Sequence, residues 1–333
     1  MRAVRVIGPG DIEVADIPEP AHDAGYRIAV EQVGICGTDV KVVDGSVATE
    51  YPRILGHEMV GRVLASPPGG YHTEGSRVMV NPAVSCDSCD LCLAGRTNLC
   101  RNGGLMGRDV DGVFADVIVA PESSIVAVPD QVSKEASGLL QVLGTCVHAT
   151  KTVNAFPGKT AAVIGLGVAG QLIAQLLVLQ GISVVGITRS EWKRDLALRL
   201  GASRVAAPED AADVLREVTS DSGPDIVVEA VGTERTLSEA IELVGVGGEI
   251  VVFGTVTRGG SGLPYYQLYH KELTLHNPRA ALTRDYVDGV ALAASGALKL
   301  DPIVTHQVAL ADAERAFELV GDSSSLKVLM HVD

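Results

Sequence analysis

The chain has 333 residues, enough for about two domains of ordinary size. Hydrophobic residues make up 47% of it, and 41 acidic against 27 basic residues give a net charge of −14. This balance disfavours nucleic acid and anionic membranes as partners, and no apolar stretch reaches the roughly 18 residues of a membrane-spanning helix. The N-terminus has no apolar stretch typical of an export signal, so we expect a soluble, cytoplasmic protein.

Residues 1–130 consist largely of short β-branched runs separated by glycine, proline and aspartate, which predict strands at 26–33, 60–64, 77–80 and 114–119. Two polar motifs interrupt them, Cys36-Gly37-Thr38-Asp39 and Gly56-His57-Glu58. A thiolate, an imidazole and a carboxylate make a plausible zinc site with one position open for a substrate oxygen. Because His57 and Glu58 are neighbours in the sequence, alternation of side chains does not by itself place both on one metal.

Four cysteines follow within fifteen residues, in the pattern Cys86-x₂-Cys89-x₂-Cys92-x₇-Cys100. This spacing suits a tetrahedral thiolate site for one structural zinc ion, which holds a loop together without binding substrate. Two disulfides would use the same residues in a secreted protein, whereas thiols persist in a reducing cytosol. Iron–sulfur clusters usually have other spacings, and reduced cysteines in a mobile loop are the remaining alternative.

Between Thr160 and Gly254 short strands alternate with helical patterns, which predicts an α/β fold with a parallel sheet. We expect strands at 161–164, 183–188, 226–229 and 250–253, and helices at 171–180 and 191–200. Gly165-Leu166-Gly167-Val168-Ala169-Gly170 follows the first of these strands and opens a helix, the context in which such a glycine pattern binds a dinucleotide. Glycines that merely ease a turn are the alternative.

The end of the second strand bears on which dinucleotide is bound. NAD-binding folds usually have Asp or Glu there to accept from the ribose 2′-hydroxyl, but this chain has Thr188-Arg189-Ser190. A guanidinium pairs with a 2′-phosphate and a hydroxyl donates to it, so we expect NADP to be preferred. If Arg189 is only a solvated surface cation, NAD is used as well. The ends of later strands are also expected to line the cofactor, at Val231, Gly254 and Thr255.

Together these motifs resemble those of the zinc-dependent medium-chain alcohol dehydrogenases, in the branch of polyol, sugar and threonine dehydrogenases. The resemblance spans most of the chain and rests on residues 34–39, 56–58, the four-cysteine run, residues 165–170 and Lys271-Glu272-Leu273. It implies a β-rich, GroES-like catalytic domain formed by residues 1–132 and 279–333, with a zinc lobe at 84–102. It also implies a doubly wound Rossmann domain at 133–278, and a homodimer or homotetramer.

The resemblance further implies two zinc ions per chain, one structural and one catalytic. Cys36 and His57 would bind the catalytic ion, Asp39 would orient His57, and Glu58 would be a direct ligand or one that moves on and off the metal. Gln141 stands where many relatives have the glutamate of Glu-Pro-Leu; it would bind the ion directly, bind through water, or only line the site. Because the glutamine amide is neutral, only the Cys36 thiolate and the Glu58 carboxylate would oppose the two positive charges of Zn²⁺. We therefore expect a nearly neutral site.

The activity implied is hydride transfer between a nicotinamide and a secondary alcohol or matching ketone of a polyol, sugar, cyclitol or similar small molecule. Thr38 would hydrogen-bond the substrate oxygen and pass its proton outward. Lys41 stands where relatives frequently have a relay histidine; it would relay protons, face solvent or contact an anionic group. Two other functions are compatible with the sequence: an NADPH-binding zinc protein without a catalytic metal, acting as a sensor, and a reductase of C=C or C=N bonds.

Overall fold

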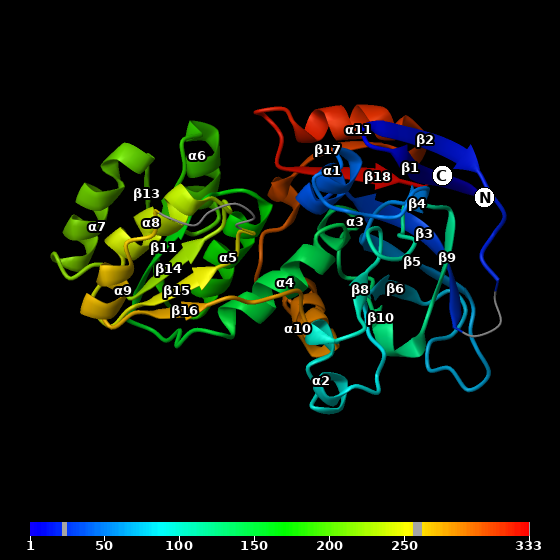
Figure 1. The fold of residues 1–333 in the computed structure, drawn as a ribbon, viewed down its shortest axis with the longest axis horizontal. Coiled ribbons are helices and arrows are strands. Elements are labelled where there is room, and N and C mark those ends of the chain that lie inside the picture. Colours follow the sequence, from blue (N-terminus) through cyan, green and yellow to red (C-terminus); the bar gives the residue numbers. More distant parts are fainter. Residues whose placement is uncertain (22–24, 256–261, 333) are drawn as a thin grey trace. The chain divides into compact units, whose positions relative to one another are not determined.

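The structure is a computed structural model that describes residues 1–21, 25–255 and 262–332. The chain forms two compact units, one made of residues 1–144, 280–296 and 300–333, the other of residues 145–279 and 297–299 (Figure 1). The first unit continues past residue 132, where the sequence suggested a boundary. It does so because Gly138 lies directly against Leu329, and the Ser133 hydroxyl donates to Asp301 at 2.6 Å.

The first unit is rich in strands. They are β1 (Arg2–Gly8), β2 (Asp11–Asp16), β3 (Tyr26–Gly34), β4 (Arg53–Ile54), β5 (Glu58–Ala65), β6 (Arg77–Val80), β7 (Ala83–Val84), β8 (Gly104–Leu105), β9 (Val117–Ala120), β10 (Ile125–Ala127), β17 (Val304–Ala309) and β18 (Lys327–His331). Its helices are α1 (Gly37–Val43), α2 (Asp90–Leu93), α3 (Lys134–Ser137), α10 (Thr283–Ala294), α11 (Ala313–Val320) and the start of α4 (Leu140–Thr150).

Seven of these strands form one sheet in the order β10-β6-β5-β3-β18-β17, with β9 also paired to β3, and the others form the smaller sheets β2-β1-β4 and β7-β8. The last strand of the chain, red in Figure 1, therefore lies beside a strand from its beginning, drawn in blue. The run predicted at 114–119 becomes a strand only from Val117. Phe114 instead lies in an irregular segment, and its buried ring packs on Gly56, which has no side chain to obstruct it.

The second unit contains a parallel sheet with helices between its strands. The strands are β11 (Thr160–Ile164), β12 (Ser183–Ile187), β13 (Arg204–Ala206), β14 (Ile226–Glu229), β15 (Glu249–Val252) and β16 (Thr274–His276). The helices are α5 (Val168–Leu179), α6 (Glu191–Arg199), α7 (Ala211–Thr219), α8 (Glu234–Leu243) and α9 (Tyr265–His270).

The strand order of this sheet is β13-β12-β11-β14-β15-β16, and all its pairs are parallel. This is the doubly wound order of a Rossmann fold, so the predicted fold class is confirmed. The order reverses between β11 and β14, and the loops that follow these strands lie at the switch point where such sheets bind ligands. The sequence analysis did not predict the short strands β13 and β16.

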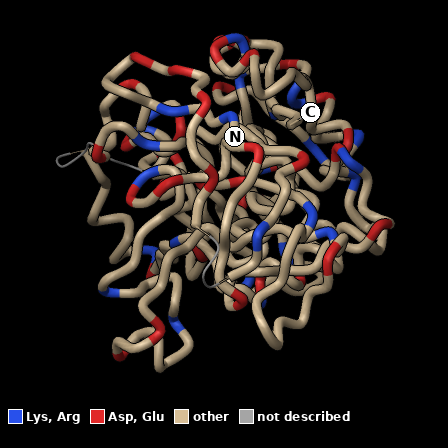
Figure 2. Tube along the Cα trace, turned by 90° about the vertical axis from the view of Figure 1, so that its right-hand side faces the viewer, with Lys and Arg blue, Asp and Glu red and all other residues tan. Residues whose placement is uncertain are grey.

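Two features of the described residues are the character of their helices and the distribution of their charges. None of their helices combines the length and apolar character needed to cross a bilayer. Figure 2 shows acidic and basic residues interspersed along the trace, so the net negative charge is not gathered into one stripe.

Candidate active site

Cys36, His57 and Glu58 come together in the first unit. One ligand atom from each lies within 4.8 Å of the others. Cys36 caps the N-terminus of α1 directly after β3, and Glu58 opens β5 opposite Gly34. A side chain at Gly34 would overlap the Glu58 carboxylate, so glycine leaves the room that this group occupies. His57 precedes the regular strand, and alternation along β5 therefore does not separate it from Glu58.

Asp39 connects the two loops that carry this cluster. Its buried carboxylate accepts from the Cys36 amide at 2.8 Å and the Gly56 amide at 3.2 Å, and it lies 3.4 Å from His57 Nδ1. Burial alone lowers the pKa of His57, but the charges of Asp39 and Cys36 outweigh it and raise that pKa well above its usual value.

The two residues expected to handle protons both lie on α1. The Thr38 hydroxyl is 3.8 Å from Cys36 Sγ, at the edge of the cluster. Lys41 is half-buried in the last turn of the helix, where its carbonyl accepts from the Val47 amide at 2.9 Å.

Lys327 is a site residue that the sequence analysis missed. It begins β18, is only 2% exposed, and its ammonium group contacts the Glu58 carboxylate while donating to the Ile35 carbonyl at 3.0 Å. The only signal in the sequence is a lysine at the head of an apolar strand. This ammonium adds one positive charge to the site that was expected to be nearly neutral.

Gln141 lies in the same buried part of the first unit. It occupies the first turn of α4, and its Nε2 donates to the hydroxyl of Tyr286, on α10, at 3.4 Å. Burial raises the pKa of Tyr286, and the charge of Glu58 adds to the effect. Tyr286 is thus a direct neighbour of Gln141, although 145 residues separate the two in the sequence.

The four cysteines of the lobe also converge. Their sulfur atoms lie within 4.8 Å of one another, and none of the described cysteines forms a disulfide. The sulfur separations of 3.4 Å (Cys86–Cys100) and 4.0 Å (Cys89–Cys100) bracket the edge of about 3.8 Å in a tetrahedral zinc–thiolate site. Hydrogen bonds from Ser88 and the Cys89 amide lower the pKa of Cys86 to about 5, which favours its thiolate. These residues fit zinc.

In the second unit, the glycine motif forms a tight turn between β11 and α5. Gly165 has φ +93°, and a side chain there would strike Val231. A side chain at Gly170 would overlap the Gly165 carbonyl, whereas one at Gly167 would meet none of the described atoms within 4 Å. Gly167 therefore leaves open space at the N-terminus of a twelve-residue helix, which fits a pyrophosphate.

The remaining residues predicted to bind the cofactor lie at the carboxyl ends of β12, β14 and β15. Arg194 donates to the carbonyls of Thr188 and Arg189 at 2.7 and 3.0 Å and fixes this turn; Ser190 then caps α6, and the Arg189 side chain is exposed. After β14, buried Glu229 accepts from the amides of Val231 and Gly232 at 2.8 and 2.9 Å. Gly232 in turn lies directly against Gly254 and Thr255.

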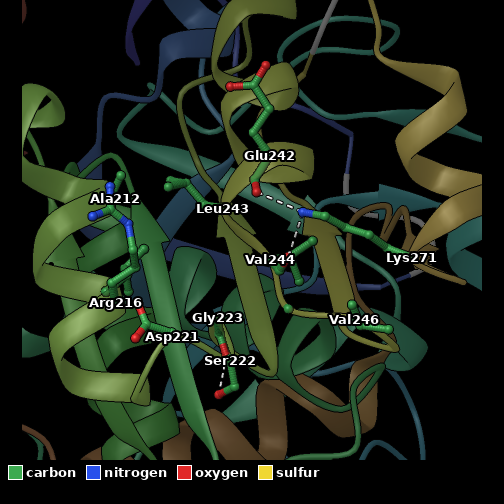
Figure 3. Close-up of a pocket in the computed structure, with 12 residues that line it drawn as sticks. Ala212, Arg216, Asp221, Ser222, Gly223, Glu242, Leu243, Val244, Val246 and Lys271 are labelled. Carbon is green, nitrogen blue, oxygen red and sulfur yellow. Dashed lines mark hydrogen bonds between the residues drawn. The ribbon is translucent and has the colours of Figure 1, made fainter.

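Lys271, from the Lys271-Glu272-Leu273 motif, stabilises the C-terminus of α8. Its ammonium group donates to the carbonyls of Ile241, Glu242 and Val244 at 3.0, 2.8 and 2.9 Å. Figure 3 shows Lys271 with Glu242 and Val244. The cavity beside it, of about 290 Å³, is lined by residues that precede β14 and β15. It therefore lies at the edge of the sheet opposite the glycine turn.

Comparison with known proteins identifies the family. The model of the "Alcohol dehydrogenase GroES-like domain" matches residues 22–130, and that of "Zinc-binding dehydrogenase" matches residues 168–295. The L-threonine 3-dehydrogenase of Idiomarina loihiensis is 30% identical over 339 residues, which cover 98% of this chain and 97% of the relative. The chain belongs to the zinc-type medium-chain alcohol dehydrogenases. The family expected from the motifs is thus confirmed, and the protein is an oxidoreductase.

This dehydrogenase is also similar to a sorbitol dehydrogenase, which supports the polyol and threonine branch, and to a solved dehydrogenase structure. The sorbitol dehydrogenase of Bacillus subtilis is 29% identical over 332 residues, covering 96% of this chain and 93% of the relative. A solved structure from Sinorhizobium meliloti 1021, described as a zinc-binding dehydrogenase bound to NADP, is 29% identical with a TM-score of 0.92. The match covers 99% of this chain and 98% of the solved chain.

Proposed function

We propose that this dehydrogenase interconverts a secondary alcohol and its ketone on a polyol, sugar, cyclitol or similar small molecule, with NADP(H) as the preferred cofactor. The observation that carries the proposal is the buried cluster of Cys36, His57 and Glu58, with Asp39 behind the imidazole. Binding a dinucleotide alone requires none of these groups, which argues against a sensor without a catalytic metal. Relatives named for sorbitol and threonine support the substrate class.

Each residue of the cluster has a distinct task in this proposal. Cys36, His57 and Glu58, with Gln141 beside them, would hold a zinc ion, whose Lewis acidity stabilises negative charge on the substrate oxygen. Asp39 accepts from His57 Nδ1, which leaves Nε2 as the ligand atom. Thr38 would hydrogen-bond the substrate oxygen and relay its proton: Oγ1 accepts the substrate proton while the threonine's own hydroxyl proton moves to water. Lys41 lies one turn further along α1, and its role as a proton relay stays a prediction.

The other parts of the proposal concern binding and assembly. The four cysteines of the lobe hold a second, structural zinc ion, and the turn at Gly165–Gly170 binds the pyrophosphate of the cofactor. Arg189, with Thr188 and Ser190, binds the 2′-phosphate. The protein works in the cytoplasm as a homodimer or homotetramer, which its mass in solution tests.

Metal content and turnover test the function together. We expect two zinc ions per chain, and NADP reduction with at least one member of a panel of polyols, sugars, aminocyclitols and threonine, followed by the absorbance of NADPH. One zinc per chain without turnover on the panel would instead favour the sensor. Turnover only on C=C or C=N substrates would favour the reductase.

Replacing Arg189 tests the choice of cofactor. We expect Arg189→Ala to raise the KM for NADP about 10–100-fold, because a charge-assisted contact to the 2′-phosphate is lost, while the KM for NAD stays unchanged. Arg199→Ala, which removes an exposed arginine at the other end of α6, is the matched control and should change neither value. A wild-type enzyme that turns over NAD faster than NADP at equal concentration contradicts this role.

A further inference from the structure

Helices α4 and α10 approach each other closely at a pair of glycines. A side chain at Gly144 would overlap the ring of Tyr286, so this ring occupies space that only glycine leaves free. On the other helix, a side chain at Gly289 would lie 3.4 Å from the Gly144 nitrogen and 3.4 Å from Leu143 Cγ. The two helices therefore clamp the tyrosine ring between them.

The start of α10 is held independently of this crossing. The Asp285 carboxylate accepts from the Leu282 amide at 3.0 Å, and Thr283 Oγ1 accepts from Asn81 Nδ2 at 3.1 Å. Tyr286, in the first turn of this helix, is 0% exposed. With ring and helix both constrained, the position of the Tyr286 hydroxyl is defined by packing rather than by solvent.

The segment that leads into α4 packs against two strands, β3 and β18, that also carry neighbours of Glu58. Gln32 and Gly34 share one face of β3; Ser137 Oγ contacts Gln32 Oε1 at 3.4 Å, and Gly34 adjoins the Glu58 carboxylate. On β18, Lys327 holds Glu58 while Leu329, two residues on, packs against Gly138. The residues before Gln141 are thus anchored on β3 and β18, the two strands whose Gly34 and Lys327 adjoin Glu58.

At this place an amide differs from a carboxylate in one respect. A glutamate presents oxygen to a metal whichever way it turns, whereas glutamine presents oxygen in one orientation and a nitrogen donor in the other. Zinc binds side-chain oxygen, and an NH₂ group turned toward it would be unfavourable. Gln141 Nε2 donates to Tyr286 at 3.4 Å, which leaves Oε1 as the other end of the amide.

We propose that Tyr286 is a positioning residue that holds the Gln141 amide nitrogen and so directs Oε1 toward the metal bound by Cys36, His57 and Glu58. This inference rests on the proposed function, because it requires a metal at that cluster. It makes Tyr286 the partner of the glutamine that replaces the glutamate of many relatives. The hydroxyl, rather than the ring, carries the effect.

Cobalt spectroscopy tests the role without relying on turnover. Zinc is removed from the full-length protein, Co²⁺ is added, and visible absorbance and chelator competition report the ligand field and affinity of each site. We expect Tyr286→Phe to weaken Co²⁺ binding at the Cys36 site about 10–100-fold and to shift its absorption bands. The four-cysteine site should be unaffected.

Two comparisons separate this role from a merely structural one. Tyr26→Phe is the matched control: Tyr26 is also 0% exposed, its hydroxyl bonds Glu122, and its loss should leave both cobalt spectra unchanged. In a Gln141→Glu background, Tyr286→Phe should have much less effect on affinity and bands, since either carboxylate oxygen serves.

The possible results distinguish a failure of this inference from a failure of the proposed function on which it rests. Two bound Co²⁺ ions with wild-type affinity and bands in Tyr286→Phe would overturn the role of Tyr286 and leave the proposed function intact. An equal effect of Tyr286→Phe in the Gln141→Glu background would also overturn it. Wild-type protein that binds Co²⁺ only at the four cysteines would overturn the proposed function, and this inference with it.

Discussion

The Cys36→Ser variant is expected to oxidise its alcohol substrate about 1000-fold more slowly than the wild type, or not at all. Cys36 supplies the only thiolate of the Cys36–His57–Glu58 cluster, and a serine hydroxyl is a poor zinc ligand at neutral pH. Losing the metal removes several kcal/mol of stabilisation of charge on the substrate oxygen, and each 1.36 kcal/mol or so is a factor of ten in rate. Initial rates of NADPH formation measure the loss.

Metal content shows whether this loss has the expected cause. Cys36→Ser should bind one zinc per chain instead of two and keep the thermal stability of its lobe. Cys100→Ser is the control with the opposite pattern. It should also lose one zinc, but from the lobe, and it should lower the unfolding temperature more than it lowers the rate of alcohol oxidation. If Cys36→Ser retains two zinc ions and the wild-type rate, the assignment of the catalytic site is wrong.

With the metal of the Cys36 site removed, the Lys327→Met variant is expected to be less stable than the equally treated wild type by about 3–5 kcal/mol, because the buried Glu58 carboxylate then has neither its ammonium partner nor a metal ion. Methionine is similar in length to the lysine stem, so the change removes charge with little change in packing. The free energy of unfolding, from denaturant or thermal titration of the purified protein, measures the effect.

Two further variants identify the unpaired charge as the reason. Lys327→Arg keeps a positive charge beside Glu58 and should lose much less stability. The double variant Lys327→Met with Glu58→Gln removes both charges and should regain much of the lost stability. It still lacks the carboxylate that Glu58 would offer to a metal. A Lys327→Met protein as stable as the wild type would show that the Glu58–Lys327 pair contributes little to folding.

Two groupings of residues in the structure follow from local patterns in the sequence. Four cysteines within fifteen residues, and a glycine motif between an apolar strand and a helix, bring their members together whatever the rest of the chain does. The alternation of strand and helix patterns from Thr160 onward is likewise a local feature of the sequence, and it predicts the parallel sheet. The boundaries of elements were less certain, since they depend on neighbours such as the buried ring of Phe114.

The sequence by itself therefore determined the family, both folds and the chemical types of the candidate metal ligands. Only the tertiary structure showed that His57 and Glu58 reach the same point as Cys36, that Lys327 contacts Glu58, and that Tyr286 contacts Gln141. Lys327 is 269 residues from Glu58, and Tyr286 is 145 residues from Gln141. At such separations no spacing rule applies, because strand pairing and helix packing, not local geometry, decide which side chains meet.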